Sequence, residues 1–190
     1  MSPIIGVIDS AKTGRLTTGD YESISTVTVG PAGQSTIVFN SIPQTYAHLQ
    51  LRCLLKDSRV SSTNSGSSMR FNGDTGSNYS EWDMFGDSSS MLQSGSTTTS
   101  SLPMFNYPAS NSNSSTFGMG ILDILYYSNT NVYKNIRSFG GHSQNTVADG
   151  FITFYAGTWK NNSAVTSITI SPLTAPFVQY STVALYGIKG

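Results

Sequence analysis

Two segments with a strand-like pattern close the chain: Thr166-Ser-Ile-Thr-Ile-Ser-Pro172 and Gln179-Tyr-Ser-Thr-Val-Ala-Leu-Tyr-Gly-Ile-Lys-Gly190. Apolar residues alternate with others in both, as Ile168 and Ile170 do with Thr and Ser. A period of two is what a sheet needs when its two faces meet different environments. Because the last strand is followed by almost no tail, we expect it to lie inside the fold, paired with earlier strands of a β-sandwich.

The composition is poor in charge. Only 11% of the 190 residues are charged, against about 25% in typical globular proteins. Ten Lys and Arg balance ten Asp and Glu, so the net charge is zero. This balance gives no electrostatic footprint for nucleic acid or an anionic membrane, and no apolar run approaches the ~18 residues of a membrane helix. We therefore expect neither partner, and a near-neutral surface suits a protein that works inside an assembly.

Residues 1–20 differ from residues 21–190, which we expect to form one sandwich domain. The first twenty residues combine an apolar patch with a polar, glycine-punctuated stretch. One interpretation is a first strand packed on its own domain. The other, which we adopt, is an arm that adds an apolar segment to the sheet edge of a neighbouring subunit. The predicted interface residues of this arm are Ile4, Ile5, Val7, Ile8 and Leu16.

From residue 21 onward, short strand-like segments alternate with turns. Residues 47–56 form the longest apolar segment and are predicted to be central. Residues 23–29 and 35–39 flank a glycine-rich turn and predict a hairpin. Residues 57–68, 86–101 and 106–116 are polar and are predicted to be loops. Other strands are predicted at 69–72, 79–85, 117–127, 132–139 (ended by Gly140-Gly141), 151–159 and in the two closing segments.

No segment carries a helical apolar stripe, so the fold class expected is all-β. About ten short strands at this spacing predict an antiparallel β-sandwich, jelly-roll-like, with an extended N-terminal arm. The single cysteine, Cys53, alternates in phase with Leu49 and Leu51. We interpret it as a buried small hydrophobe rather than a reactive thiol.

Glu81, Asp83 and Asp87 form the densest acidic cluster. Glycoside hydrolysis needs two carboxylates about 5–10 Å apart, one of them in an apolar pocket. The Ser- and Gly-rich surroundings instead indicate a solvated polar face. His48 and His142, the two histidines, show no metal-ligand spacing and are expected at the surface. We therefore expect no enzyme, no cofactor and no metal.

The segment Asn72-Gly-Asp-Thr-Gly-Ser-Asn78 has oxygen-bearing side chains at alternate positions, as a calcium loop does. It lacks the expected terminal acid, and Asx and Gly residues also build tight turns, so we favour a structural turn. Aromatic residues such as Trp82, Tyr107 and Trp159 either stack on sugars or pack in the core and at interfaces, and the second role is the commoner one.

Four segments carry a resemblance to known proteins: Tyr21-Glu-Ser-Ile-Ser-Thr-Val-Thr-Val-Gly30, Ser41-Ile-Pro-Gln-Thr-Tyr-Ala-His-Leu-Gln-Leu-Arg52, Arg70-Phe-Asn-Gly-Asp-Thr-Gly-Ser-Asn-Tyr-Ser80 and Ala184-Leu-Tyr-Gly-Ile-Lys-Gly190. In this order they resemble virion structural proteins of tailed bacteriophages, common in cyanophages and other aquatic phages. The resemblance spans residues 21–190 and includes no catalytic residues. Members of this group are variously cement, tail or other structural proteins, so it implies a virion rather than a place within it.

Two functions are therefore expected. The first is a capsid cement or decoration protein on the outer surface of the capsid. It would clamp coat subunits through its arm and sandwich domain, with the major capsid protein and copies of itself as partners in a homo-oligomer. The alternative is a tail-fibre or receptor-binding module that recognises a host-surface glycan through its polar loops and interleaved aromatic residues.

Overall fold

The computed structural model describes residues 19–87, 89–112, 115–144 and 150–190. These residues form twelve β-strands and no helix, which confirms the predicted all-β class. Nothing in this part of the chain is a helix long and apolar enough to cross a membrane. The five residues predicted for the arm, from Ile4 to Leu16, lie outside the described residues.

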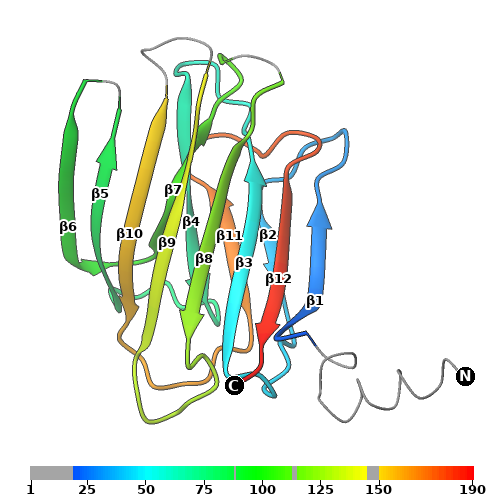
Figure 1. Ribbon diagram of the computed structural model, residues 1–190, viewed down its shortest axis with the longest axis vertical. Coiled ribbons are helices and arrows are strands. Elements are labelled where there is room, and N and C mark those ends of the chain that lie inside the picture. Colours follow the sequence, from blue (N-terminus) through cyan, green and yellow to red (C-terminus); the bar gives the residue numbers. More distant parts are fainter. Residues whose placement is uncertain (1–18, 88, 113–114, 145–149) are drawn as a thin grey trace, which may run out of the picture.

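The strands form two antiparallel sheets packed as a sandwich, with the large sheet in front and the small sheet behind in Figure 1. The eight-stranded sheet has the order β1 (Tyr21–Thr28), β12 (Thr182–Ile188), β3 (His48–Leu55), β8 (Gly118–Leu125), β9 (Lys134–His142), β10 (Phe151–Trp159), β5 (Tyr79–Gly86), β6 (Met91–Thr99). The four-stranded sheet has the order β2 (Ile37–Phe39), β11 (Ile168–Pro172), β4 (Asn64–Phe71), β7 (Leu102–Pro108).

Eight of these strands make a jelly roll. Without β5, β6, β9 and β10, the order β1-β12-β3-β8 faces the order β2-β11-β4-β7, which gives the two four-stranded sheets of that fold. The other four strands are insertions: β5 and β6 lie in sequence between β4 and β7, and β9 and β10 between β8 and β11. Both pairs join the same sheet beyond β8, so one sheet doubles its width.

Each of the two closing strands is an interior strand of one sheet: β12 in the large sheet, as predicted for the last strand, and β11 in the small sheet. Strand β12 pairs with β1 and β3 and places Leu185 opposite Leu51. Strand β11 pairs with β2 and β4 and places Ile168 between Phe39 and Phe71. Both strands form backbone ladders with a neighbour on each side, so the two closing strands complete the two sheets.

The core fills the space between the sheets. Its largest fully buried side chains include Trp159, Tyr79 and Tyr107. Cys53 is also buried there, as predicted, and burial raises the pKa of its thiol. The Phe105 ring packs closely on Gly120 of β8, where a Cβ atom would lie 2.4 Å from it.

Several local predictions are wrong. Strands β1 and β2 lie in different sheets and form no hairpin. Residues 91–99 form β6, an edge strand whose Ser and Thr side chains face solvent while its backbone pairs with β5. Likewise β4 begins at Asn64, and β7 runs to Pro108. Composition predicted loops in all three places. Polar residues are common on edge strands such as β6 and β7, where they discourage aggregation, whereas β4 is an interior strand held by pairing with β11 and β7.

Gly140 and Gly141 do not end β9, which continues to His142. A Cβ atom at Gly140 would lie 2.7 Å from a ring carbon of Phe105, and one at Gly141 would meet the backbone of Phe151. These glycines are therefore explained by close packing from both sides rather than by a break in the strand.

Candidate interaction surface

The eight-stranded sheet has an inner face, which packs on the small sheet, and an outer face, which points away from it. Seven large apolar side chains on the outer face are between 38% and 64% exposed. We call them the apolar patch: Leu54 on β3, Met119 and Ile121 on β8, Phe139 on β9, Ile152 and Phe154 on β10, and Met84 on β5.

Cross-strand register makes the apolar patch continuous. Ile121 lies opposite Phe139, Phe139 opposite Phe154, and Phe154 opposite Met84. Side chains of this size and exposure leave on the order of 700 Å² of apolar surface open, whereas the largest patch on a typical monomer is about 300–600 Å². An antiparallel sheet with one solvated face normally alternates apolar-in and polar-out. This sheet departs from that pattern at its centre, which makes the apolar patch the candidate contact surface.

A hollow of about 870 Å³ opens at one end of the apolar patch. Gly86 and Gly141 line it without side chains, and Met119, Phe139 and Ile152 contribute apolar walls. Its volume falls in the ~300–1,000 Å³ range of small-ligand pockets. The hollow makes the patch concave, so a partner with a protruding apolar group fits it better than a flat one.

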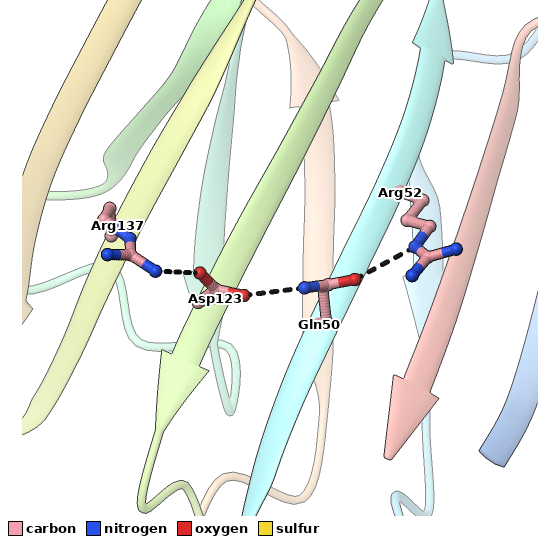
Figure 2. A network of polar contacts seen from close by, with 4 residues as sticks. All are labelled: Gln50, Arg52, Asp123 and Arg137. Carbon is pink, nitrogen blue, oxygen red and sulfur yellow. Dashed lines mark hydrogen bonds and ion pairs between the residues drawn. The ribbon is translucent and has the colours of Figure 1, made fainter. Parts of the chain in front are cut away.

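A polar network borders the apolar patch across β9, β8 and β3 (Figure 2). Arg137 forms an ion pair with Asp123 at 2.7 Å. The amide of Gln50 donates to the other carboxylate oxygen of Asp123 at 2.9 Å, and Arg52 Nε donates to Gln50 Oε1 at 2.9 Å. Gln50 is buried although it lies on the outer face, because its neighbours cover it.

The network continues into an aromatic clamp at β1 and β12. The guanidinium of Arg52 lies 5.2 Å from the ring centroid of Tyr21 and 5.0 Å from that of Tyr186. Contacts between a cation and two rings are worth about 0.5–1 kcal/mol each at exposed sites. These contacts therefore cover the outer face around Gln50, Arg52 and Asp123, whereas the apolar patch, which begins on the same strands β3 and β8, stays exposed.

The structure divides the aromatic residues between the core and the surface. Tyr107 and Trp159 are buried, and Trp159 Nε1 donates to Asp74 Oδ2 at 2.7 Å. Trp82, on β5, is 65% exposed on the outer face. It stands beside a groove of about 230 Å³ that Ala156 also lines.

The acidic residues do not form the solvated face that we predicted. Glu81 and Asp83 do share one side of β5, but it is the inner side, where Glu81 is half-buried. Burial and then the charge of Asp83 raise the pKa of Glu81, and burial followed by the two carboxylates raises the pKa of Tyr155 to about 12. Asp87 instead belongs to the β5–β6 turn, where hydrogen bonds led by that from the Ser89 hydroxyl lower its pKa to about 2.

The histidines lie at opposite ends of the strands. His48 Nδ1 accepts a hydrogen bond from the Tyr126 backbone N–H at 3.1 Å on the outer face. His142 stacks on Phe151 with 5.8 Å between ring centroids. Within the described residues, no three His, Cys, Asp or Glu side chains are grouped so that they could hold a metal ion.

The segment 72–78 is a structural turn. Asn72 and Gly73 have φ values of 51° and 68°, the left-handed pair that a tight turn requires. Asp74 Oδ1 accepts from the Gly76 N–H at 2.8 Å, and both its oxygens accept from the Asn78 amide. Together with Trp159, these donors occupy the carboxylate that a calcium ion would need. The most distinctive segment of the resemblance is therefore explained by folding.

Sequence reasoning missed the apolar patch, although a signal was present. The segment Gly118-Met-Gly-Ile-Leu-Asp-Ile-Leu125 is apolar in both strand phases, with Leu122 and Ile124 inward and Met119 and Ile121 outward. Such a run indicates a strand covered on both faces. The sequence of this segment did not show that the small sheet covers only one of the two faces of the strand.

Comparison with known proteins finds no family model, no curated protein and no solved structure that matches the chain significantly. The fold and the surface together define the chain as a jelly-roll sandwich with a widened sheet and an exposed apolar face.

Proposed function

We propose that the chain is a structural protein of a bacteriophage virion, a non-enzymatic capsid cement or decoration protein on the outer surface of the capsid. The apolar patch carries the proposal. Its ~700 Å² is close to the ~800 Å² that each partner contributes to a standard protein interface. The sequence resemblance to phage virion proteins supports the setting, and the jelly roll is a fold that viral capsid proteins use.

In this proposal the two parts of the protein have separate roles. The jelly-roll strands contribute most of the buried core. The inserted strands present most of the apolar patch to a coat subunit or to another copy of the chain. The proposed arm, residues 1–20, supplies a further apolar segment that would clamp a neighbouring subunit through Ile4, Ile5, Val7, Ile8 and Leu16.

The location is tested by labelling intact phage particles with a gold-tagged antibody against the chain. Gold distributed over the head is the expected result. Gold on the tail alone would overturn the cement proposal in favour of the tail-fibre module. Absence of gold from particles would overturn the virion proposal.

The contact surface is tested with two matched variants on heads that lack the protein. Ile152, in the apolar patch, and Leu173, in a loop outside it, are 63% and 66% exposed. Ile152→Asp should weaken binding to heads about tenfold or more, because a charge would be buried against apolar surface. Leu173→Asp should bind as the parent does. Equal binding of both variants would show that the patch is not the contact.

The second candidate is a tail-fibre or receptor-binding module that recognises a host-surface glycan. The exposed Trp82 and the groove beside it favour this function. It predicts gold on the tail and binding of the isolated chain to host cells that is competed by soluble sugar. We rank the cement proposal first because the apolar patch that supports it is larger than the groove beside Trp82.

A further inference from the structure

We propose that the groove beside Trp82 binds a single neutral sugar ring, which stacks on the indole. This inference does not depend on a capsid role, because the groove lies next to the apolar patch and shares none of its seven side chains. A sugar site could serve either a decoration protein or a tail protein.

The orientation of Trp82 is set by a glycine on the neighbouring strand. Trp82 lies opposite Gly95 of β6, and a Cβ atom at Gly95 would lie 2.7 Å from indole atoms Cδ2 and Cε3. The six-membered ring therefore rests on the bare backbone of β6, and its other side remains open to solvent. A tryptophan held in this way provides a preformed stacking surface, so a ligand does not have to order it.

The floor of the groove is small. Ala156 of β10 lies opposite Trp82 on one side and Arg137 of β9 on the other. The methyl group of Ala156 leaves a gap between these two long side chains. Since adjacent strands are about 4.8 Å apart, the gap spans two strand spacings, on the order of 10 Å, which is wide enough for one pyranose ring.

The end of the groove is polar. Ser80, Asn135 and Thr158 line it from three adjacent strands. Thr158 Oγ1 donates to Asn135 Oδ1 at 3.1 Å, which leaves the Asn135 amide hydrogens available as donors at this end of the groove. A row of hydroxyl and amide groups beside an aromatic ring matches the two surfaces of a sugar: C–H groups on its face and hydroxyls at its edge.

The electrostatics favour a neutral sugar. Arg137 is the charged group nearest in register on the outer face, and its guanidinium is already paired with Asp123 at 2.7 Å. Glu81 contributes to the groove wall, but it alternates with Trp82 and so points its carboxylate to the inner side of β5. Lys160, two residues beyond Thr158, donates to the Thr97 carbonyl oxygen at 2.6 Å, so a carboxylated sugar would have to compete with existing partners of both cations. The volume of about 230 Å³ is below the ~300–1,000 Å³ of typical ligand pockets, so one ring fits and a longer chain would extend into solvent.

The binding test follows the two indole N–H signals by NMR. The full chain is titrated with the methyl glycosides of glucose, galactose, mannose and N-acetylglucosamine, and with glucuronate. The Trp82 signal should shift saturably with at least one neutral glycoside, with a dissociation constant on the order of 1 mM, as expected for about a dozen ligand atoms. The Trp159 signal should not move, because that indole is buried and bonded to Asp74.

Three variants locate the site, with sugar-observed saturation transfer as the measurement. Trp82→Ala should abolish the saturation transfer, and Thr158→Val should weaken binding several-fold by removing the hydroxyl and keeping the shape. Met119→Ala is the control, since Met119 is equally exposed on the outer face but lies outside the groove. All three should melt as the parent does. No saturable Trp82 shift with any neutral glycoside, binding only of glucuronate, or binding that survives Trp82→Ala would overturn the proposal.

Discussion

The eight-stranded sheet consists of two halves that differ in what covers them. In one half, the jelly-roll strands β1, β12, β3 and β8 pack inward on the small sheet and cover part of their outer face with the Arg52 clamp and the Gln50–Asp123 network. In the other half, the inserted strands β9, β10, β5 and β6 leave apolar side chains open to solvent. Strand β6 is exposed along most of its length.

We infer from this difference that the jelly-roll half mainly provides stability, whereas the outer face of the inserted half mainly provides recognition. The jelly-roll half supplies most of the core, to which the inserted strands add Trp159, Tyr79 and Ile136. The inserted half carries four of the seven side chains of the apolar patch, together with the Trp82 groove. Substitutions in the first half should therefore change folding, and those in the outer face of the second half should change binding.

The largest expected effect comes from the jelly-roll half. Leu185→Ala on β12 removes a fully buried side chain between the sheets and should lower the free energy of unfolding by about 3 kcal/mol. Ile152→Ala on β10 should change it by less than about 0.5 kcal/mol, because Ile152 is largely exposed. Urea denaturation of both variants measures the contrast. Similar losses would mean that the outer face is covered in the folded protein.

The next effect concerns the turn before β5. The Asn72 side chain accepts N–H bonds from Thr166 at 2.8 Å and Ser167 at 3.1 Å, and donates to the Ala164 carbonyl at 2.8 Å. Asn72→Ala loses these bonds and strains a position with φ 51°, so a loss of about 2 kcal/mol is expected.

Asn72→Gly is the matched control for the turn. It relieves the strain but not the lost hydrogen bonds, so its thermal unfolding should fall between that of the parent and that of Asn72→Ala. If Asn72→Gly is as stable as the parent, then the hydrogen bonds from Asn72 to residues 164, 166 and 167 do not stabilise the fold, and the role of Asn72 is to adopt the turn conformation.

A smaller effect is expected where the two halves meet. Asp123→Ala breaks the ion pair to Arg137 and leaves the buried amide of Gln50 without its acceptor, a loss of about 1 kcal/mol. Asp123→Asn keeps an acceptor and should cost less. Denaturation at low and high salt separates the terms, since only the exposed ion pair is screened. Equal losses for the two variants would assign the whole effect to charge.

The smallest effect lies inside β5. Burial and Asp83 raise the folded-state pKa of Glu81, so its contribution to stability is present below the unfolded pKa and is lost as the pH rises through the folded pKa. Glu81→Gln stays neutral, and near pH 7 it should be more stable than the parent by about 0.5 kcal/mol, since Glu81 is only half-buried. The gain should vanish at about pH 3. Melting curves across this range test it, and a gain that is independent of pH would contradict it.

Strand periodicity allowed much of the jelly roll to be predicted. Ile168 and Ile170 alternate with Thr and Ser, and Val183 and Leu185 alternate with Thr182 and Ala184, which predicted two strands. The last of them was expected inside the fold, and both are interior strands. The predictions failed where pairing depends on distant partners. Strand β1 pairs with β12 rather than with β2, which follows it in the sequence. The polar strand β6 forms because its backbone hydrogen-bonds to β5. The composition of residues 91–99 does not indicate that β5 will pair with them.

The candidate surfaces show the same division. The sequence by itself determined the residue types, namely a zero net charge, an all-β pattern and strands apolar in both phases, because these depend only on local order along the chain. The tertiary structure alone decided that two insertions join the same sheet, that the small sheet covers one face only, and that Trp82 stands over Gly95 beside Ala156. Burial and register are properties of pairs of distant segments, so no local pattern contains them.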